Sequence, residues 1–141
     1  MIALDTNILI YAHLSRCPEH RRARAAVELA AQHERGWGFA LPCLAEFWAV
    51  ATHPAAAGRP SRPTEARAFL ANLTAAGARV FCPTSKTAAQ VADLAVSLDI
   101  RGHRIFDLQI AQICTEAGVR ELWSHDKNFV TVSGLNLRDP L

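Results

Sequence analysis

The chain is poor in lysine, and it lacks both a long apolar run and a paired-cysteine motif. Lys86 and Lys127 are its only lysines. No apolar stretch reaches the roughly 20 residues that a membrane helix needs, and no basic leader precedes a long apolar run, as a secretory signal would require. We therefore expect a soluble, cytoplasmic protein that does not associate with membranes.

The cysteines also lack any spacing that is typical of a metal or redox site. They are Cys17, Cys43, Cys82 and Cys114. The chain has no C-x-x-C pair and no histidine partner at zinc-finger spacing. We expect these thiols to be reduced and to belong to the core of a cytosolic protein.

The composition and length of the chain suit one globular domain over residues 1–141. Half of its residues are hydrophobic, and a domain of this length buries roughly two-thirds of the surface that the unfolded chain exposes. The formal net charge of +2 says little alone, but arginines are frequent in the first half: Arg16, Arg21, Arg22, Arg24, Arg59, Arg62 and Arg67. A solvated helix face explains any one of them, whereas together they favour a phosphate-rich partner.

Predicted strands and helices alternate, with no internal repeat or low-complexity tract. The predicted strands cover residues 1–4, 37–41, 79–82, 121–123 and 135–137. The predicted helices begin near residue 8 and also cover 18–34, 42–52, 64–76, 84–98 and 105–117. Residues 53–63 are rich in Pro, Gly and Ala and predict a mobile loop. This order predicts a three-layer α/β/α fold with a central, mainly parallel sheet of four to five strands.

Four acidic residues stand in apolar surroundings, and they are Asp5, Glu46, Asp107 and Asp126. The first and last follow predicted strands, and the middle two interrupt predicted helices. A carboxylate on an apolar face costs desolvation energy unless a charge pairs with it. Neither predicted helix contains a Lys or Arg one turn from its acid, so a shared divalent cation is the economical explanation.

The periodicity of helices and sheets places these acids together. Residues three, four and seven positions apart share a helix face. The face of Glu46 then carries Cys43, Ala49, Val50 and His53, and that of Asp107 carries Ile110, Ala111 and Cys114. The other two acids follow strands, and parallel sheets carry their sites at the carboxyl ends of strands.

Each acid also has a simpler interpretation. Asp5 alone is as readily a helix cap, Asp126 a turn residue, and Glu46 or Asp107 an acid at a helix edge. Four unrelated coincidences are less expected than one shared site. In such a site without metal, at least one carboxylate should bind a proton more readily than a free carboxylate does.

The type of ligand favours Mg²⁺ or Mn²⁺ over zinc. Carboxylate oxygens are hard ligands, and no set of two histidines or of cysteines accompanies them. Zinc bound through His53, His103 or His125 is the alternative, but no H-x-x-x-H type of spacing supports it.

Four segments in order resemble the PIN-domain family across the whole chain. They are Leu4-Asp5-Thr6-Asn7, Cys43-Leu44-Ala45-Glu46-Phe47, Ile105-Phe106-Asp107-Leu108-Gln109-Ile110-Ala111 and Ser124-His125-Asp126-Lys127-Asn128-Phe129. The predicted last strand and Pro140 also look like the family's ending. Size and layout are most similar to the VapC toxins of bacterial type II toxin–antitoxin pairs.

The resemblance implies a metal-dependent endoribonuclease that acts as a toxin. By analogy, the four acids would hold one or two Mg²⁺ or Mn²⁺ ions, Thr6 and Asn7 would support the first acid, and Ser124 keeps the hydroxyl of the family's threonine. Asn128 stands where many relatives have an Asp, which puts a second ion in doubt. The implied partners are an RNA substrate, a cognate antitoxin and a second copy in a homodimer. The apolar Phe47 and Trp48 beside Glu46 are either core or the surface for such a partner.

Two other interpretations remain at this point. A receiver-like or dehalogenase-like enzyme also places Asp at strand ends, but the chain reads Asp5-Thr6-Asn7 where a dehalogenase needs D-x-D. A catalytically weak PIN-like scaffold that binds RNA or protein is the stronger rival. Retention of all four acids favours catalysis over that scaffold.

Overall fold

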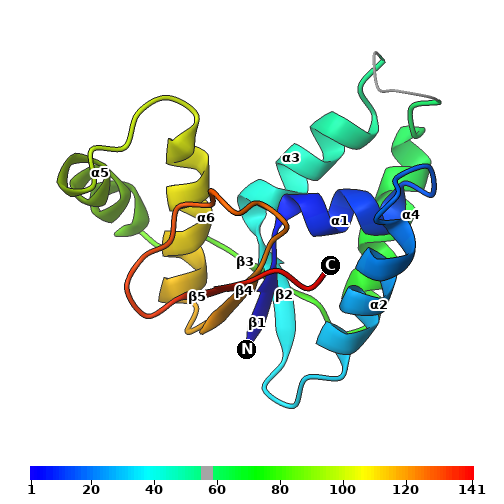
Figure 1. Cartoon of the computed structure of the whole chain (residues 1–141), viewed down its shortest axis with the longest axis horizontal. Coiled ribbons are helices and arrows are strands. Elements are labelled where there is room, and N and C mark those ends of the chain that lie inside the picture. The colour runs from blue at the N-terminus through cyan, green and yellow to red at the C-terminus, as the bar shows by residue number, and fades with distance from the viewer. Residues whose placement is uncertain (55–58) are drawn as a thin grey trace.

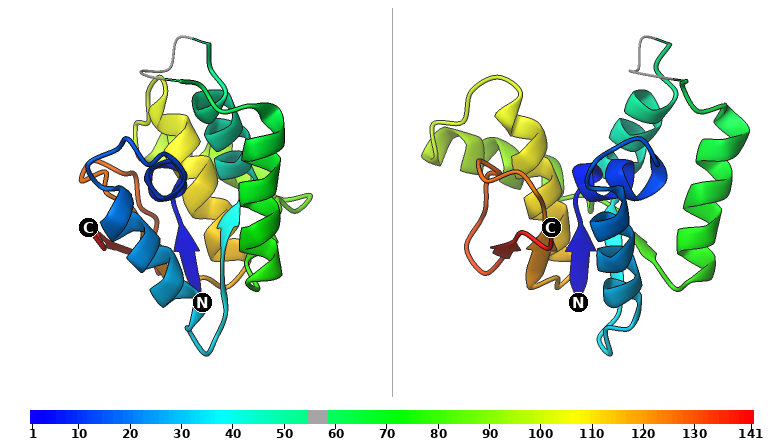
Figure 2. Two further views of the ribbon diagram at one scale, coloured as in Figure 1. Left: turned by 90° about the vertical axis from the view of Figure 1, so that its right-hand side faces the viewer. Right: turned by 45° about the vertical axis from the view of Figure 1, so that its right-hand side comes forward.

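The structure is a computed structural model that describes residues 1–54 and 59–141, and it has three layers (Figure 1). A five-stranded sheet forms the middle layer. Figure 2 shows α1 (Thr6–His13), α2 (His20–Ala31) and α4 (Pro63–Ala75) on one face of the sheet, and α6 (Arg104–Glu116) on the other. The predicted three-layer α/β/α fold is confirmed.

The sheet is parallel at every pairing, in the order β3-β2-β1-β4-β5. Its strands are β1 (Ile2–Leu4), β2 (Trp37–Ala40), β3 (Arg79–Phe81), β4 (Glu121–Trp123) and β5 (Asn136–Arg138). The central strand β1 is fully buried, as expected for a parallel strand with helices on both faces. Because all strands run the same way, their carboxyl ends lie along one edge of the sheet.

Most predicted elements are present, with ends that differ by a few residues. The remaining helices are α3 (Leu41–Ala51) and α5 (Thr87–Ser97). Helix α1 begins two residues before its predicted start because Asp5 caps it directly. The last strand is shifted by one residue, and the predicted loop over 53–63 includes residues 55–58, which lie outside the described residues.

Strands β2 and β3 approach each other so closely that one position requires glycine. A Cβ atom built on Gly38 would lie 2.0 Å from the carbonyl oxygen of Arg79. No side chain fits at that distance, so Gly38 sets how tightly the edge strand β3 joins the sheet.

Helix α5 stands apart from the main core. Its only buried residue is Thr87, whose hydroxyl donates to Glu116 of α6 at 2.6 Å. Together with a bond from Gln112 to Gln90 (2.9 Å), this contact fastens α5 to α6 through polar groups. Among the described residues, no helix has the length and hydrophobicity to cross a membrane.

The cysteines match their predicted burial only in part. Cys43 and Cys114 are fully buried, whereas Cys17 is half-buried and Cys82 is exposed, and all four are free thiols. The exposed position of Cys82 follows from its place just after the edge strand β3, where no element covers it.

Candidate active site

Asp5 lies at the carboxyl end of the central strand and caps α1. Its Oδ1 accepts the backbone N–H of Thr6 at 2.7 Å, and its Oδ2 accepts both Asn7 Nδ2 (2.8 Å) and the hydroxyl of Ser124 (2.6 Å). The residue is only 6% exposed. The two interpretations of Asp5 are therefore compatible, since the same carboxylate caps the helix and faces the edge where the strands end.

Thr6 connects Asp5 to Glu46. Its backbone N–H donates to the first acid, and its hydroxyl donates to Glu46 Oε2 at 2.5 Å. Glu46 comes from the middle of α3 and is half-buried. The predicted apolar face around it is only partly correct, because Val50 is 45% exposed. Thr6 thus fixes two carboxylates that are 41 positions apart in the sequence.

Ser124 and Asn7 link Asp5 to the segment that carries Asp126. The Asn7 side chain donates to Ser124 Oγ (2.9 Å) and accepts the backbone N–H of His125 (3.1 Å). Ser124 Oγ also accepts the backbone N–H of Asp126 at 3.0 Å. This closed set of bonds holds the loop after β4 against the start of α1, and it leaves the exposed carboxylate of Asp126 facing solvent.

Asn128 contributes here through its backbone. Its N–H donates to Asp126 Oδ1 at 2.8 Å, as any residue other than proline could. The side chain of Asn128 is exposed. The replacement of the family's usual Asp therefore leaves the orientation of Asp126 intact and removes one charge from the rim.

Asp107 lies in the first turn of α6, where its neighbours Ile110 and Cys114 are buried as predicted. Burial raises the pKa of Asp107, a hydrogen bond from the Val130 backbone opposes that rise, and the charges of Asp126 and Glu46 add to it. The helix begins one residue earlier than predicted, so Arg104 lies within one turn and lowers this pKa slightly without reversing the direction.

The pKa of Asp5 shows how little positive charge the site contains. Burial raises it from 3.8 to about 6, although hydrogen bonds from Ser124 and Thr6 act in the opposite direction. The charges of Glu46 and Asp107 raise it further. The four acids therefore influence one another electrostatically, and Asp5 binds a proton more readily than a free carboxylate does, as expected of crowded carboxylates.

No lysine or arginine neutralises this cluster within the described parts of the chain. All ion pairs there involve other acids: Glu28, Glu65, Asp99, Glu121 and Asp139. Hard oxygen donors without a cation fit Mg²⁺ or Mn²⁺ in chemistry and charge. Across residues 1–54 and 59–141, however, no three His, Cys, Asp or Glu side chains already converge as metal ligands, so the fit lies in the donor set and not in a finished coordination shell.

One further arrangement at the rim has no signal in the sequence. His125 Nδ1 lies 2.9 Å from Asp139 Oδ2, and its ring makes an edge contact with Tyr11, with centroids 6.2 Å apart. A carboxylate that accepts from Nδ1 fixes the proton on that nitrogen. His125 thus has a partner near the end of the chain, which only the fold brings close.

An apolar groove opens beside Glu46 between α3 and α6. It encloses about 570 Å³, and its walls include Leu41, Leu44, Phe106 and Ile113. Of the two alternatives for Phe47, core or partner surface, the core is correct, because Phe47 is completely buried. The exposed apolar side chains here are Leu41 (42% exposed) and Phe106 (53% exposed).

Comparisons with known proteins agree with this architecture. The model of the PIN domain matches residues 2–135. A VapC ribonuclease, Mb2897 of Mycobacterium bovis, is 30% identical over all of this chain and 96% of its own length. Ribonuclease VapC48 of Mycobacterium tuberculosis is 27% identical over 96% of this chain and 94% of its own.

Solved structures show the same fold at lower identity. VapC20 of Mycobacterium tuberculosis, described as a sarcin–ricin loop cleaving toxin, superposes with a TM-score of 0.69 at 19% identity, over 92% of each chain. VapBC2 of Rickettsia felis, solved on a DNA fragment of its promoter, superposes with a TM-score of 0.70 at 20% identity, over 99% of this chain and 98% of that one.

Proposed function

Because the chain belongs to the PIN-domain family, we propose that it is a metal-dependent endoribonuclease and the toxin of a toxin–antitoxin pair. The similarity to VapC ribonucleases over the full length supports the activity. The observation that carries the metal dependence is the set of acids around Asp5, whose pKa rises to about 6 with no cation beside it. We assign residues 1–141 to one nuclease domain.

The proposed ligands are Asp5, Glu46, Asp107 and Asp126. A bound Mg²⁺ or Mn²⁺ ion lowers the pKa of its water and neutralises the charge that builds up on the phosphate. Among the described residues no three of these side chains converge, so they would have to move closer together to hold an ion jointly. Thr6 limits that movement on one side by holding Glu46 beside Asp5.

The supporting residues fix the first carboxylate before substrate arrives. Ser124 and Asn7 both donate to Asp5 Oδ2, so this oxygen keeps one orientation. Such outer partners typically change metal affinity or activity by about 10–100-fold. Since the pKa of Asp5 is about 6, ion binding must displace its proton at lower pH, and we expect cleavage to decline as the pH falls through 6.

RNA is the proposed substrate, and the cytoplasm is the proposed compartment. A cognate antitoxin is the proposed inhibitor, because neighbours in fold are solved as VapBC complexes. We place that partner or a second copy of this chain on the groove of Leu41, Leu44, Phe106 and Ile113, since it is apolar and borders Glu46. Sedimentation of the purified protein would measure the proposed homodimer.

Cleavage of total RNA tests the proposed function. We expect discrete fragments from the wild type with Mg²⁺ or Mn²⁺, and none with EDTA or from an Asp107→Asn variant prepared in the same way. Equal fragments from both proteins would indicate a contaminating nuclease. Absence of cleavage by wild type with either ion would overturn the nuclease assignment and favour the scaffold that binds RNA or protein.

A further inference from the structure

A second polar pocket lies at the opposite end of α1 from Asp5. It encloses about 560 Å³, a size typical of small-ligand sites, and its lining includes His13, Ser15, Arg16, Arg59 and Ser61. Helix α1 spans eight residues, or about 12 Å at 1.5 Å per residue. The acidic site and this pocket are therefore separated by about the length of this helix.

The pocket is built from two segments that are distant in the sequence. Arg16, after α1, donates to the backbone carbonyl of Arg59 at 2.9 Å. On the inner side, His13 Nε2 lies 2.9 Å from the hydroxyl of Ser61. The ring of His13 packs between Phe47 and Phe69, with centroids 5.2 and 4.9 Å away. The pocket floor is thus continuous with α3, the helix that carries Glu46.

The charge of the pocket is positive and is held in place. Glu65 Oε1 accepts Arg59 at 2.8 Å and Arg62 at 3.1 Å, while its Oε2 accepts the backbone N–H of Arg62 at 2.8 Å. Of the charged residues that line the pocket, Arg16 and Arg59 are positive and Glu65 is negative. The guanidinium groups of Arg59 and Arg62 remain largely exposed, with 70% of each side chain accessible, so they can still donate to an incoming anion.

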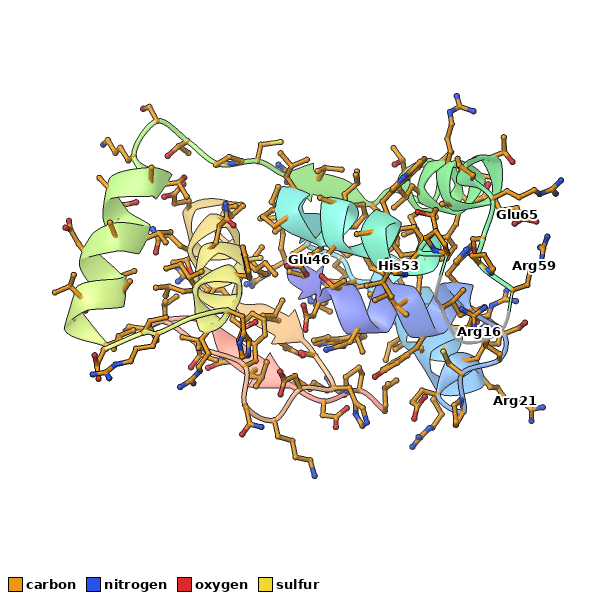
Figure 3. The ribbon with its side chains drawn as sticks, turned by 90° about the horizontal axis from the view of Figure 1, so that it is seen from above. Arg16, Arg21, Glu46, His53, Arg59 and Glu65 are labelled. Atoms are coloured by element: carbon orange, nitrogen blue, oxygen red, sulfur yellow. The ribbon has the colours of Figure 1, made fainter. Side chains whose placement is uncertain are left out.

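Figure 3 shows where the acidic site and the arginine pocket lie relative to each other. Glu46 lies near the middle of the molecule, and Arg16, Arg59 and Glu65 gather at one end, with His53 between them. Helices α1 and α3 run side by side from the first region toward the second. A strand placed along these helices would meet carboxylates at one end and guanidinium groups at the other.

We propose that Arg16 and Arg59 bind the phosphate backbone of the substrate RNA on one side of the cleaved bond. This inference rests on the proposed function. Arginine forms paired hydrogen bonds with phosphate oxygens, and the hydroxyls of Ser15 and Ser61 supply donors in the same pocket. Because the contact is with phosphate and not with bases, it fixes the position of the strand across Asp5 without selecting a sequence.

The first test measures RNA affinity in a background that does not cleave. A fluorescein-labelled single-stranded RNA is titrated with Asp107→Asn protein, with and without Arg16→Gln and Arg59→Gln together. We expect the double substitution to weaken binding at least about tenfold and to reduce the slope of log K against log salt by about 1.4, at about 0.7 per phosphate contact. Arg35→Gln is the matched control, since Arg35 is exposed and directly precedes Gly36 and β2, at the opposite edge of the sheet.

The second test measures cleavage kinetics in the wild-type background. We expect Arg16→Gln and Arg59→Gln to raise KM with kcat nearly unchanged, and Arg16→Lys to recover part of the affinity. Unaltered RNA affinity and KM in the double variant, with thermal unfolding like that of the wild type, would overturn the proposal. Loss of binding to polyglutamate with intact RNA binding would assign the arginines to an acidic protein partner instead. Failure of the nuclease assignment shows separately, as absence of cleavage by the wild type.

Discussion

Asp5 and Glu65 lie near opposite ends of α1, and their pKa values move in opposite directions. The pKa of Asp5 rises to about 6 because the carboxylate is buried among other acids. The pKa of Glu65 falls to about 2, first because the Arg62 backbone N–H donates to it and then because Arg59 does. The two carboxylates therefore differ in their partners: Glu65 is neutralised by arginines of the same chain, whereas Asp5 has no cation beside it.

The difference also explains where each residue contributes to stability. A carboxylate whose folded pKa is lowered stabilises the fold when ionised, and one whose pKa is raised destabilises it. Asp5 therefore works against folding near neutral pH, and the chain retains it for its chemistry. The low pKa of Glu65 reflects exposed partners, and exposed ion pairs add little to stability.

Asp5→Asn should produce the largest effect on cleavage. The amide keeps the shape but removes a charged ligand, and we expect kcat/KM to fall at least about 100-fold, since loss of an outer partner alone often costs about 10–100-fold. Steady-state cleavage of RNA with Mn²⁺ measures it. Glu34→Gln, an equivalent change in the exposed turn before β2, serves as the control. Retention of wild-type activity by Asp5→Asn would show that cleavage does not need the charge of Asp5, contrary to the distinction drawn between Asp5 and Glu65.

The stability of the metal-free protein should depend on pH through Asp5. Its folded pKa of about 6 exceeds the ordinary 3.8, so between about pH 4 and 6 the folded chain binds a proton that the unfolded chain has released. The unfolding free energy should therefore fall as pH rises through this window, by about 3 kcal/mol, given about 1.4 kcal/mol per unit of separation. Urea unfolding in EDTA from pH 4 to 7.5 measures this change.

The control for that experiment is Asp5→Asn in the same buffers. The pKa of His13 is lowered mainly by burial, so its titration changes stability with the opposite sign. Only the difference between wild type and Asp5→Asn isolates the carboxylate. Parallel curves for the two proteins would mean that Asp5 has an ordinary pKa, contrary to its burial.

Thr6→Val should have an intermediate effect. The change removes the hydroxyl that donates to Glu46 at 2.5 Å and keeps the backbone N–H that donates to Asp5. We expect about a tenfold loss of Mn²⁺ affinity and of kcat/KM, within the range for outer partners. Thr6→Ser, which keeps the donor, should restore most of both, and equal losses in the two variants would point to packing instead.

Glu65→Gln should have the smallest effect. The side-chain carbonyl still accepts a hydrogen bond from Arg62, but without the negative charge Arg59 is held less firmly in position. We therefore expect KM for RNA to rise about threefold at physiological salt with kcat unchanged. Since the pKa of Glu65 lies near 2 and its ordinary value is 4.5, its contribution is lost only as pH falls from about 4.5 toward 2. The stability difference between Glu65→Gln and wild type should stay constant from pH 5 to 7.5.

Sequence reasoning identified the fold because its signals are local. Alternation of apolar strands and amphipathic helices is visible in short windows, and the strands and helices of the described residues follow it closely. The ends of elements were less accurate where a side chain decided them, as Asp5 does for α1. The shift of β5 by one residue reflects pairing with β4, which no local pattern encodes.

The sequence predicts which acids form the candidate site, but it does not predict the contacts between them. The unusual placement of four acids on apolar faces singled out Asp5 and Asp107 before any geometry was known. Contacts between distant residues, such as Thr6 with Glu46 and His125 with Asp139, depend on the fold. The apolar groove also escaped prediction, because Phe47 turned inward and Phe106 outward.

Calorimetric titration of the metal-free protein with Mn²⁺ at about pH 7 tests most directly whether these acids form a metal site. We predict saturable binding by the wild type with release of protons, and affinity at least about tenfold weaker for Asp107→Asn. Circular dichroism would confirm that both proteins are folded. Absence of binding by the wild type, or equal binding by the two proteins, would contradict the assignment of the acids around Asp5 to a metal ion.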